Sequence, residues 1–452
     1  MFMLKKILTT ISVLLLSACN SMLFQPVETI SQITPNQGYR AKNIIEKHQD
    51  GDLIILMLSG GGSRAAALGY GVLEQFKQTK IGTNPLKASL LDNIDLVFGV
   101  SGGSVLATYF SLEGKDVVPK FEDKFLKTDF QSQLTSQIFS FSNLPKLTSD
   151  QYGRGDLLQE QLNLALYKGK TFGYLANHRK GPFVIVSATD MSLGQKVIFT
   201  QEFFDGLCLN LSDVELARAV ASSSSVPLIF SPLTFNNNGG RCNYHPPEIT
   251  KMVTAITANT QKSKNVEEMR ETLASYQDSQ KRPFLHLVDG GLTDNLGLSA
   301  FTDSYDLIGK EGLYKTALAT KLKRIVIISV NAQNEVTSEI DQSANIPKTM
   351  DVVNTIVNVP IDRNTQTTLR RFRELADEWN KMMLKQPADK RVELHFVSIA
   401  LKDLPESPLK QEVLNINTSF YLPNKDINKL KQAAQILLQN SKEYQRLLEA
   451  LR

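Results

Sequence analysis

A serine in a glycine-rich turn is the first candidate for chemistry. Gly99-Val100-Ser101-Gly102-Gly103 follows an apolar run at 94–98 and precedes a helical pattern. A G-x-S-x-G motif between a strand and a helix is typical of a serine nucleophile, because the sharp turn strains the serine and exposes its hydroxyl at a helix N-terminus. We therefore predict Ser101 as a nucleophile, with Gly99 and Gly103 relieving the crowding of the turn. A purely structural tight turn is the alternative.

A run of three glycines is the second candidate. Ser59-Gly60-Gly61-Gly62-Ser63-Arg64 follows the apolar run 53–58. Consecutive glycines let backbone N–H groups converge on an anion at the start of a helix. We expect Gly60, Gly61 and Gly62 to form an oxyanion hole. A nucleotide-binding loop is the alternative, but the sequence lacks the lysine of G-x-x-x-x-G-K-[ST] and the third glycine of G-x-G-x-x-G. Arg64 either steadies this loop or contacts a phosphate head group, and the sequence leaves both roles open.

An aspartate before two glycines is the third candidate. Asp289-Gly290-Gly291 ends the apolar run 284–288, and Asp294-Asn295 follows shortly after. Because Gly290 and Gly291 carry no side chains, the Asp289 carboxylate has room to face a substrate. By itself the motif also fits a turn or a helix cap. Beside the other two motifs, it predicts Asp289 as a general base.

No histidine is placed to complete a catalytic triad. The five histidines are His48, His178, His245, His286 and His395. His286 lies three residues before Asp289, so on a strand the two side chains point to opposite faces. His395 alone follows Asp289, and it lies inside an expected buried strand. The histidines also lack a metal-binding spacing such as HExxH. The sequence therefore predicts a Ser101–Asp289 dyad with no metal and no cofactor.

Continuous apolar runs that alternate with helical patterns indicate the fold. The runs are 53–58, 94–98, 183–186, 284–288, 325–330 and 394–400. Such runs are typical of strands covered on both faces. Helical patterns occur at 64–78, 104–113 and 214–221. This alternation predicts an α/β fold, a three-layer α/β/α sandwich with a central, mostly parallel sheet, in which ligand sites form at the carboxyl ends of the strands.

Four further segments extend this minimal fold. Residues 115–165 and 236–282 are expected to be insertions on the face that bears the loops. Apolar residues within 130–147 fit an acyl channel, a lid or the core. Residues 350–384 are helical, and 426–451 form one helix with a single apolar stripe. We expect this last helix to pack on the domain, with membrane contact as the alternative.

The N-terminus resembles a bacterial lipoprotein signal. Lys5 and Lys6 precede an apolar run at 7–16 that is too short to span a bilayer, and Leu16-Ser17-Ala18-Cys19 is similar to a lipobox. We predict a signal peptide at 1–18, lipidation of Cys19 and a tether over 19–51. Because Asn20 replaces the aspartate typical of inner-membrane retention, we expect a lipid-anchored protein of the bacterial cell envelope, on the outer membrane facing the periplasm. An ordinary signal peptide is the alternative.

Charge and cysteine content exclude other classes. The chain has 452 residues with 50 Lys+Arg against 46 Asp+Glu, a net charge of +4, which leaves no polybasic surface for nucleic acid. Three cysteines exclude a disulfide-dense scaffold. With Cys19 lipidated, Cys208 and Cys242 can pair in an oxidising compartment, and two reduced, buried cysteines are the alternative.

The three motifs in this order, G-G-G-S-R, G-V-S-G-G and D-G-G, resemble the patatin-like phospholipase family over about residues 52 to 306. Two weaker similarities are Ser222-Ser223-Ser224-Ser225-Val226-Pro227 and Ser187-Ala188-Thr189-Asp190, the latter expected to be a turn after a strand. The resemblance implies a hydrolase domain at 52–306 that carries both insertions. Residues 307–452 are then a C-terminal α/β extension packed on the core.

The family also implies an activity. It indicates a serine acyl hydrolase, similar to phospholipase A or lysophospholipase, that cleaves carboxylic esters of membrane lipids through an acyl-enzyme. Two alternatives are an acyltransferase with a non-water acceptor and a non-catalytic, lipid-binding envelope lipoprotein. The sequence does not define the lipid head group or the position cleaved, and the 236–282 insertion leaves the substrate size open.

Overall fold

The apolar runs form strands of one eight-stranded sheet. The computed structural model describes residues 24–46, 51–82, 88–245, 261–333 and 344–452, so the signal peptide, Cys19 and His48 lie outside the described residues. The predicted runs become β1 (Asp52–Leu58), β2 (Leu96–Val100), β3 (Phe183–Asp190), β6 (Phe284–Val288), β7 (Arg324–Asn331) and β8 (Glu393–Ala400). Two short strands that we did not predict are β4 (Gln195–Ile198) and β5 (Leu233–Asn236), which are only partly buried.

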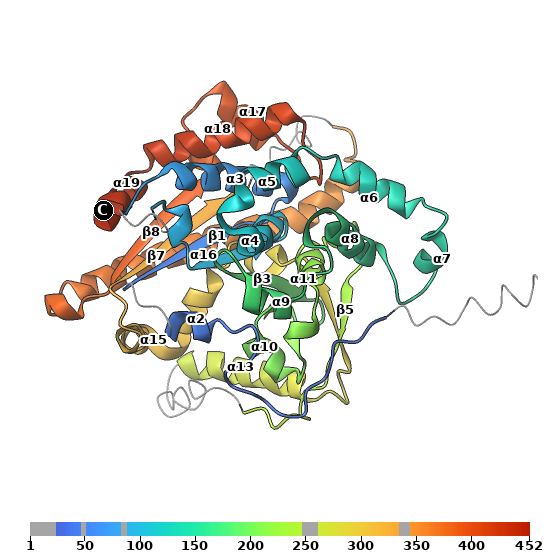
Figure 1. Cartoon of the computed structure of the whole chain (residues 1–452), viewed down its shortest axis with the longest axis horizontal. Coiled ribbons are helices and arrows are strands. Elements are labelled where there is room, and N and C mark those ends of the chain that lie inside the picture. The colour runs from blue at the N-terminus through green and yellow to red at the C-terminus, as the bar shows by residue number, and fades with distance from the viewer. Residues whose placement is uncertain (1–23, 47–50, 83–87, 246–260, 334–343) are drawn as a thin grey trace, which may run out of the picture.

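The sheet has the order β5-β6-β3-β2-β1-β7-β8, and β4 pairs with β3 off this path. Five neighbouring strands are parallel, in the order β3-β2-β1-β7-β8. On the other side of β3, β6 is antiparallel to β3 and β5 is antiparallel to β6. Helices cover the sheet on both sides (Figure 1). The predicted α/β/α fold with a mostly parallel sheet and a helical C-terminal region is confirmed.

Strand register brings the predicted loops together. Leu58, the last residue of β1, pairs with Gly99 on β2 and with Val330 on β7. The loops after these three strands therefore leave the sheet side by side. The carboxyl end of β6 meets the same edge from the other direction, because Val288 pairs with Thr189 near the end of β3.

One predicted turn is wrong. Residues 187–190 are the second half of β3, where Ser187 pairs with Ile198 and Asp190 with Gln195 of β4. The family resemblance implied a turn here, but the hydrogen bonds of the β4 ladder keep this stretch extended.

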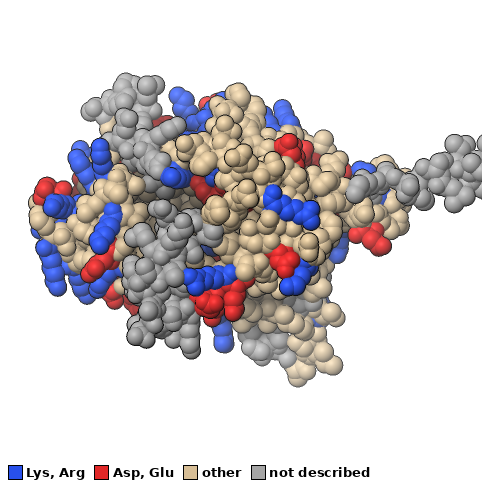
Figure 2. All heavy atoms as spheres, turned by 90° about the horizontal axis from the view of Figure 1, so that it is seen from below, with Lys and Arg blue, Asp and Glu red and all other residues tan. Residues whose placement is uncertain are grey.

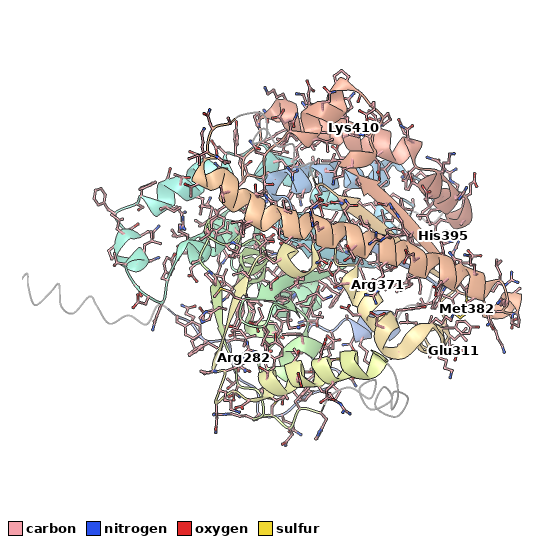
Figure 3. The ribbon with its side chains drawn as sticks, turned by 180° about the vertical axis from the view of Figure 1, so that it is seen from behind. Arg282, Glu311, Arg371, Met382, His395 and Lys410 are labelled. Atoms are coloured by element: carbon pink, nitrogen blue, oxygen red, sulfur yellow. A yellow bond between two sulfur atoms is a disulfide. The ribbon has the colours of Figure 1, made fainter. Side chains whose placement is uncertain are left out.

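Helices follow the predicted patterns closely. α3 (Gly62–Gln78), α4 (Gly102–Glu113) and α11 (Leu216–Ser223) begin within two residues of their predicted starts. The long helix α16 (Thr349–Met383) corresponds to the predicted 350–384. Figure 1 shows α3 and α4 on the near side of the sheet, and Figure 3, from behind, shows α16 crossing the other side.

The predicted C-terminal helix is two helices. α18 (Asn424–Asn440) and α19 (Lys442–Leu451) are separated at Ser441, whose hydroxyl accepts a hydrogen bond from the Tyr444 N–H and so starts a new helix. The predicted apolar stripe is buried, and α18 lies so close to α3 that a Cβ on Gly71 would stand 2.9 Å from the Cα of Lys431. The stripe therefore packs on the domain, as expected.

The remaining helices are mostly short. They are α2 (Lys42–Glu46), α5 (Val117–Phe121), α6 (Phe130–Ile138), α7 (Leu144–Leu147), α8 (Arg154–Leu162), α9 (Phe172–His178), α10 (Gln201–Gly206), α13 (Gln261–Gln277), α14 (Gly291–Asp294), α15 (Ser299–Ala319) and α17 (Pro408–Leu414). Among the helices of the described ranges, none is both long and apolar enough for a membrane span.

The described parts of the insertion, 236–245 and 261–282, pack beside the sheet. The Tyr276 hydroxyl and the Arg282 guanidinium donate to the buried Asp190 carboxylate at 3.0 and 2.7 Å. Cys242 forms a disulfide with Cys208, with a Cα–Cα distance of 5.6 Å. The insertion is therefore fastened at two points to the far end of β3 and the segment after α10.

Part of the predicted tether belongs to the folded domain. Tyr39 is buried, its ring stacks on Phe183 at 4.0 Å, and its hydroxyl donates to the Val184 carbonyl at 3.1 Å. Arg40 forms a buried ion pair with Asp205 at 2.7 Å. The prediction of a tether is thus wrong for these residues, because the surrounding polar sequence concealed their packing.

The predicted boundary at 306/307 falls inside α15. β7, which lies beyond that boundary, pairs with β1 over seven residues in the middle of the sheet. The sheet is therefore continuous across this point, and the proposed domain limits stay a prediction.

Candidate active site

Ser101 occupies a strained turn between β2 and α4. Its backbone has φ 50° and ψ −126°, which side-chain-bearing residues adopt only at a cost. A Cβ on Gly99 would come within 2.5 Å of the Ser104 Cα, and a Cβ on Gly103 would overlap the Leu58 carbonyl. The predicted glycines are therefore needed for the close approach of helix and strand that creates the turn.

The serine-rich segment 222–227 joins this turn to the aspartate loop. The Ser223 hydroxyl accepts a hydrogen bond from the Ser101 N–H at 2.8 Å. The Asp289 N–H donates to the Ser225 carbonyl at 2.9 Å, and the Gly290 N–H donates to the Ser223 carbonyl at 3.1 Å. The segment thus fixes Ser101 and Asp289 relative to each other.

Asp289 is a buried carboxylate with one free oxygen. Its Oδ1 accepts the Gly291 N–H at 2.8 Å, whereas Oδ2 has no hydrogen-bond partner among the described residues. Burial raises the pKa of Asp289 from 3.8 to about 6, although the Ser101 hydroxyl and the Gly291 N–H each lower it. Ser101 and Asp289 line the same cavity, and Asp289 Oδ2 is free to accept a proton there.

The glycine loop offers two free N–H groups rather than three. Gly61 and Gly62 have φ of 131° and 60°, and α3 begins at Gly62. Neither N–H has an acceptor in the part of the chain that the structure describes, whereas the Gly60 N–H donates to Asn295 Oδ1 at 3.1 Å. The expectation that the Gly60 N–H is an oxyanion donor is therefore wrong, because this N–H already donates to Asn295. The free donors at the positive end of α3 suit a negatively charged oxygen.

Arg64 steadies this loop. It is 2% exposed, its Nε donates to the Ala332 carbonyl at 2.8 Å, and its Nη1 donates to the Ile416 carbonyl. Burial lowers the pKa of Arg64 to about 10. These two bonds hold the start of α3 against the end of β7 and the segment before α18, which favours the supporting role among the two that the sequence left open.

A cavity of about 110 Å³ contains the predicted residues. Its floor is formed by the three motifs, and its other walls come from the 226–229 segment, the end of β7, α16 and Thr418. The lining residues are Gly60, Gly61, Arg64, Ser101, Val226, Pro227, Ile229, Asp289, Asn295, Gln333, Val357, Asn358, Ile361, Asp362 and Thr418. The three motifs thus meet in one cavity, as the sequence indicated.

The walls of this cavity were not predicted. α16 contributes Val357 and Ile361, and the Ile361 side chain stands 3.6 Å from where a Cβ on Gly291 would be. The sequence identified this helix but not its position, because the contact joins residues about 70 apart in the chain. Of the three readings left open for residues 130–147, the core is correct for Phe130 and Leu134, which are buried. Phe139 and Phe141 are exposed, and none of these four residues lines the cavity.

The described histidines take no part in the site. His286 on β6 contacts the Thr234 hydroxyl at 3.0 Å, His178 contacts the Tyr174 carbonyl, and His395 contacts Glu393. His395 borders a separate cavity of about 630 Å³ between β8, α16 and α19 (Figure 3). Within the described ranges, no cluster of His, Cys, Asp or Glu could hold a metal ion.

Comparison with known sequences identifies the family. The family described as Patatin-like phospholipase matches residues 56–302, more than half of the chain. The chain belongs to the patatin-like phospholipase family. Its match includes the glycine loop, the Ser101 turn and the Asp289 loop. Family membership supports activity on lipid esters. No curated protein sequence matches the chain.

Solved structures with a similar chain path include the human GIVD cytosolic phospholipase A2, with a TM-score of 0.47, 12% identity, and coverage of 96% of this chain and 69% of that chain. VipD from Legionella pneumophila has a TM-score of 0.30 and 12% identity over 96% of this chain and 72% of its own. The type III effector protein ExoU has a TM-score of 0.23 and 12% identity, over 88% and 75% respectively.

Proposed function

We propose that this patatin-like protein is a serine acyl hydrolase that cleaves carboxylic esters of membrane lipids with Ser101 as nucleophile and Asp289 as general base. The observation that carries the proposal is the free Asp289 Oδ2, buried beside the strained Ser101 in one cavity. A buried carboxylate oxygen with no hydrogen-bond partner is costly, and such groups concentrate at sites of proton transfer.

The first half of the reaction forms an acyl-enzyme. The Ser101 Oγ attacks the ester carbonyl carbon while its proton moves to Asp289 Oδ2. The carbonyl oxygen becomes an oxyanion, held by the N–H groups of Gly61 and Gly62, each typically worth about 3 kcal/mol of the barrier. The ester C–O bond then breaks, and the departing alcohol oxygen takes the proton from Asp289.

The second half releases the acid. Water gives its proton to Asp289 and attacks the acyl carbon, and the bond to Ser101 breaks as Oγ regains that proton. A pKa of about 6 makes Asp289 a better base than an ordinary aspartate while it stays mostly ionised at neutral pH.

Lipid mass spectrometry tests this function. The purified chain, incubated with a bacterial lipid extract, should release free fatty acid and lysolipid or glycerol-phosphate products, and a fluorophosphonate should label Ser101. Acyl chains that appear on an added alcohol instead of as free acid would assign acyl transfer. Absence of both labelling and any lipid product would indicate a non-catalytic lipoprotein.

We also propose that Cys19 is lipidated and that it anchors the protein to the bacterial outer membrane, facing the periplasm. The Cys208–Cys242 disulfide supports an oxidising compartment outside the cytoplasm. Cells fed a labelled fatty acid should incorporate the label into the wild-type chain, and the Cys19→Ser variant should lose it. Equal labelling of both proteins would refute lipidation at Cys19.

A further inference from the structure

Exposed apolar side chains lie on two of the segments that line the catalytic cavity. Ile229 lines the cavity and is 40% exposed, and its neighbour Leu228 is 70% exposed. On α16, Val357 lines the cavity, while Val352 and Ile356 are 42% and 67% exposed and share one face of the helix. We call Leu228, Ile229, Val352 and Ile356 the apolar rim.

The rim continues into a second apolar feature. Phe420, two residues after the cavity-lining Thr418, packs against Phe230 and Phe130, each with ring centroids 5.7 Å apart. Phe130 begins α6, which leads away from the rim to α7 at the edge of the molecule (Figure 1). Beyond α6, Phe139 is 74% exposed, Phe141 92% and Leu144 45%. We call these three residues the apolar arm.

The arm and rim differ from isolated surface leucines. The three residues of the apolar arm lie close together in the sequence, and large exposed apolar groups that gather in one place mark a surface that binds something, because water solvates them poorly. Figure 2 shows the underside of the molecule, where charged side chains are dense at the left end and sparser toward the right end. An apolar surface next to a site for lipid esters fits the acyl region of a bilayer.

The start of the chain supports the same orientation. Phe24, the first described residue, packs its ring 5.6 Å from Phe284 and borders a groove with residues 150–153, which follow α7. Four residues lie between Cys19 and Phe24. The five Cα–Cα steps that join the two span at most about 18 Å. A lipid on Cys19 would therefore hold the bilayer near the apolar arm.

We infer that the apolar rim and arm insert into the lipid bilayer from which the catalytic cavity takes its substrate. This inference rests on the proposed function for the choice of a lipid surface as the occupant. In this arrangement the rim and arm contact the bilayer in addition to the anchor, and this contact delivers the lipid ester to Ser101. The geometry gives the arm no contact with the cavity, so the arm contributes to membrane binding and not to the chemistry.

Vesicle binding tests the inference in the full chain carrying Cys19→Ser, so that the anchor does not mask the effect. We expect Phe139→Ser/Phe141→Ser to lower partition into phosphatidylethanolamine–phosphatidylglycerol vesicles at least tenfold, and hydrolysis of the vesicle lipid to fall in parallel. Hydrolysis of a water-soluble short-chain ester should stay within twofold. The matched control is Leu384→Ser, 72% exposed at the other end of α16 beyond the labelled Met382 (Figure 3), which should bind like the parent.

A fluorescent reporter provides an independent measurement. The chain has one tryptophan, Trp379, which is buried. In Phe141→Trp, vesicles should shift the emission to shorter wavelength and brominated lipid should quench it, whereas Leu384→Trp should show neither change. Unchanged partition of the double variant together with no shift in Phe141→Trp would overturn the inference. An emission shift that appears without vesicles and depends on protein concentration would show that the arm binds a second copy of the chain. That result would also overturn the inference.

These outcomes are separable from failure of the proposed function. A protein that binds vesicles through the arm but hydrolyses no ester contradicts the proposed chemistry alone. A protein that hydrolyses the soluble ester at full rate, with an arm that makes no difference to vesicles, contradicts the membrane contact alone.

Discussion

Replacing Ser101 with alanine should lower ester hydrolysis by about a thousandfold or more, since the acyl-enzyme has no other nucleophile. Ser101 is held in a strained conformation by the surrounding glycines, by Ser223 and by the start of α4. The variant should also lose fluorophosphonate labelling. A Ser101→Ala protein that retains a tenth of the wild-type rate would remove Ser101 from the mechanism.

A matched variant separates the chemistry from the fold. Ser101→Gly removes the same hydroxyl but accepts φ 50° without strain, which costs other residues about 1–3 kcal/mol. We expect Ser101→Gly to be as inactive as Ser101→Ala but to unfold at a higher denaturant concentration. Thermal or urea unfolding of the three proteins measures this difference. Loss of activity combined with a gain in stability would show that the strain serves the reaction.

The three motif loops could be predicted because local sterics contribute strongly to them. Gly99 must be glycine because a Cβ there would strike Ser104, five residues further along the chain. Because such a steric requirement involves only a few adjacent residues, the sequence alone indicates the turn. The same holds for the start of α3 at Gly62, where a positive φ follows directly from three consecutive glycines.

Features that depend on distant partners could not be predicted. The hydrogen bond from the Gly60 N–H to Asn295 Oδ1 joins residues 235 apart in the sequence, and no local pattern of the glycine loop reveals it. The α16 wall of the cavity depends on how a helix after β7 crosses the sheet. Residues 187–190 look like a turn until β4 pairs with them. Of these features, only the role of Asn295 could have been suspected from the sequence, because Asn295 follows shortly after the Asp289 motif.

Replacing Asp289 with asparagine should reduce turnover by about a thousandfold or more, because an amide cannot accept the Ser101 proton. The wild-type rate should depend on the ionisation of this group. Burial raises the pKa of Asp289 to about 6, so activity should be low at pH 4.5, rise through about pH 6 and level off above pH 7. A pH–rate profile on a soluble ester measures this, with Asp278→Asn, a carboxyl distant in the fold from the site, as the control that leaves the profile unchanged.

The same substitution should stabilise the protein at neutral pH. The folded-state pKa of Asp289 lies above the unfolded value of 3.8, so its contribution to stability is present below pH 3.8 and is lost as the pH rises through about 6. About two pKa units correspond to about 3 kcal/mol at pH 8. Asp289→Asn carries no such charge, so its free energy of unfolding should exceed that of the wild type at pH 8, and the two should converge at pH 4. An equal or lower stability of Asp289→Asn at pH 8 would mean that the ionised carboxylate is well solvated, and the base would then lack the raised pKa on which the mechanism depends.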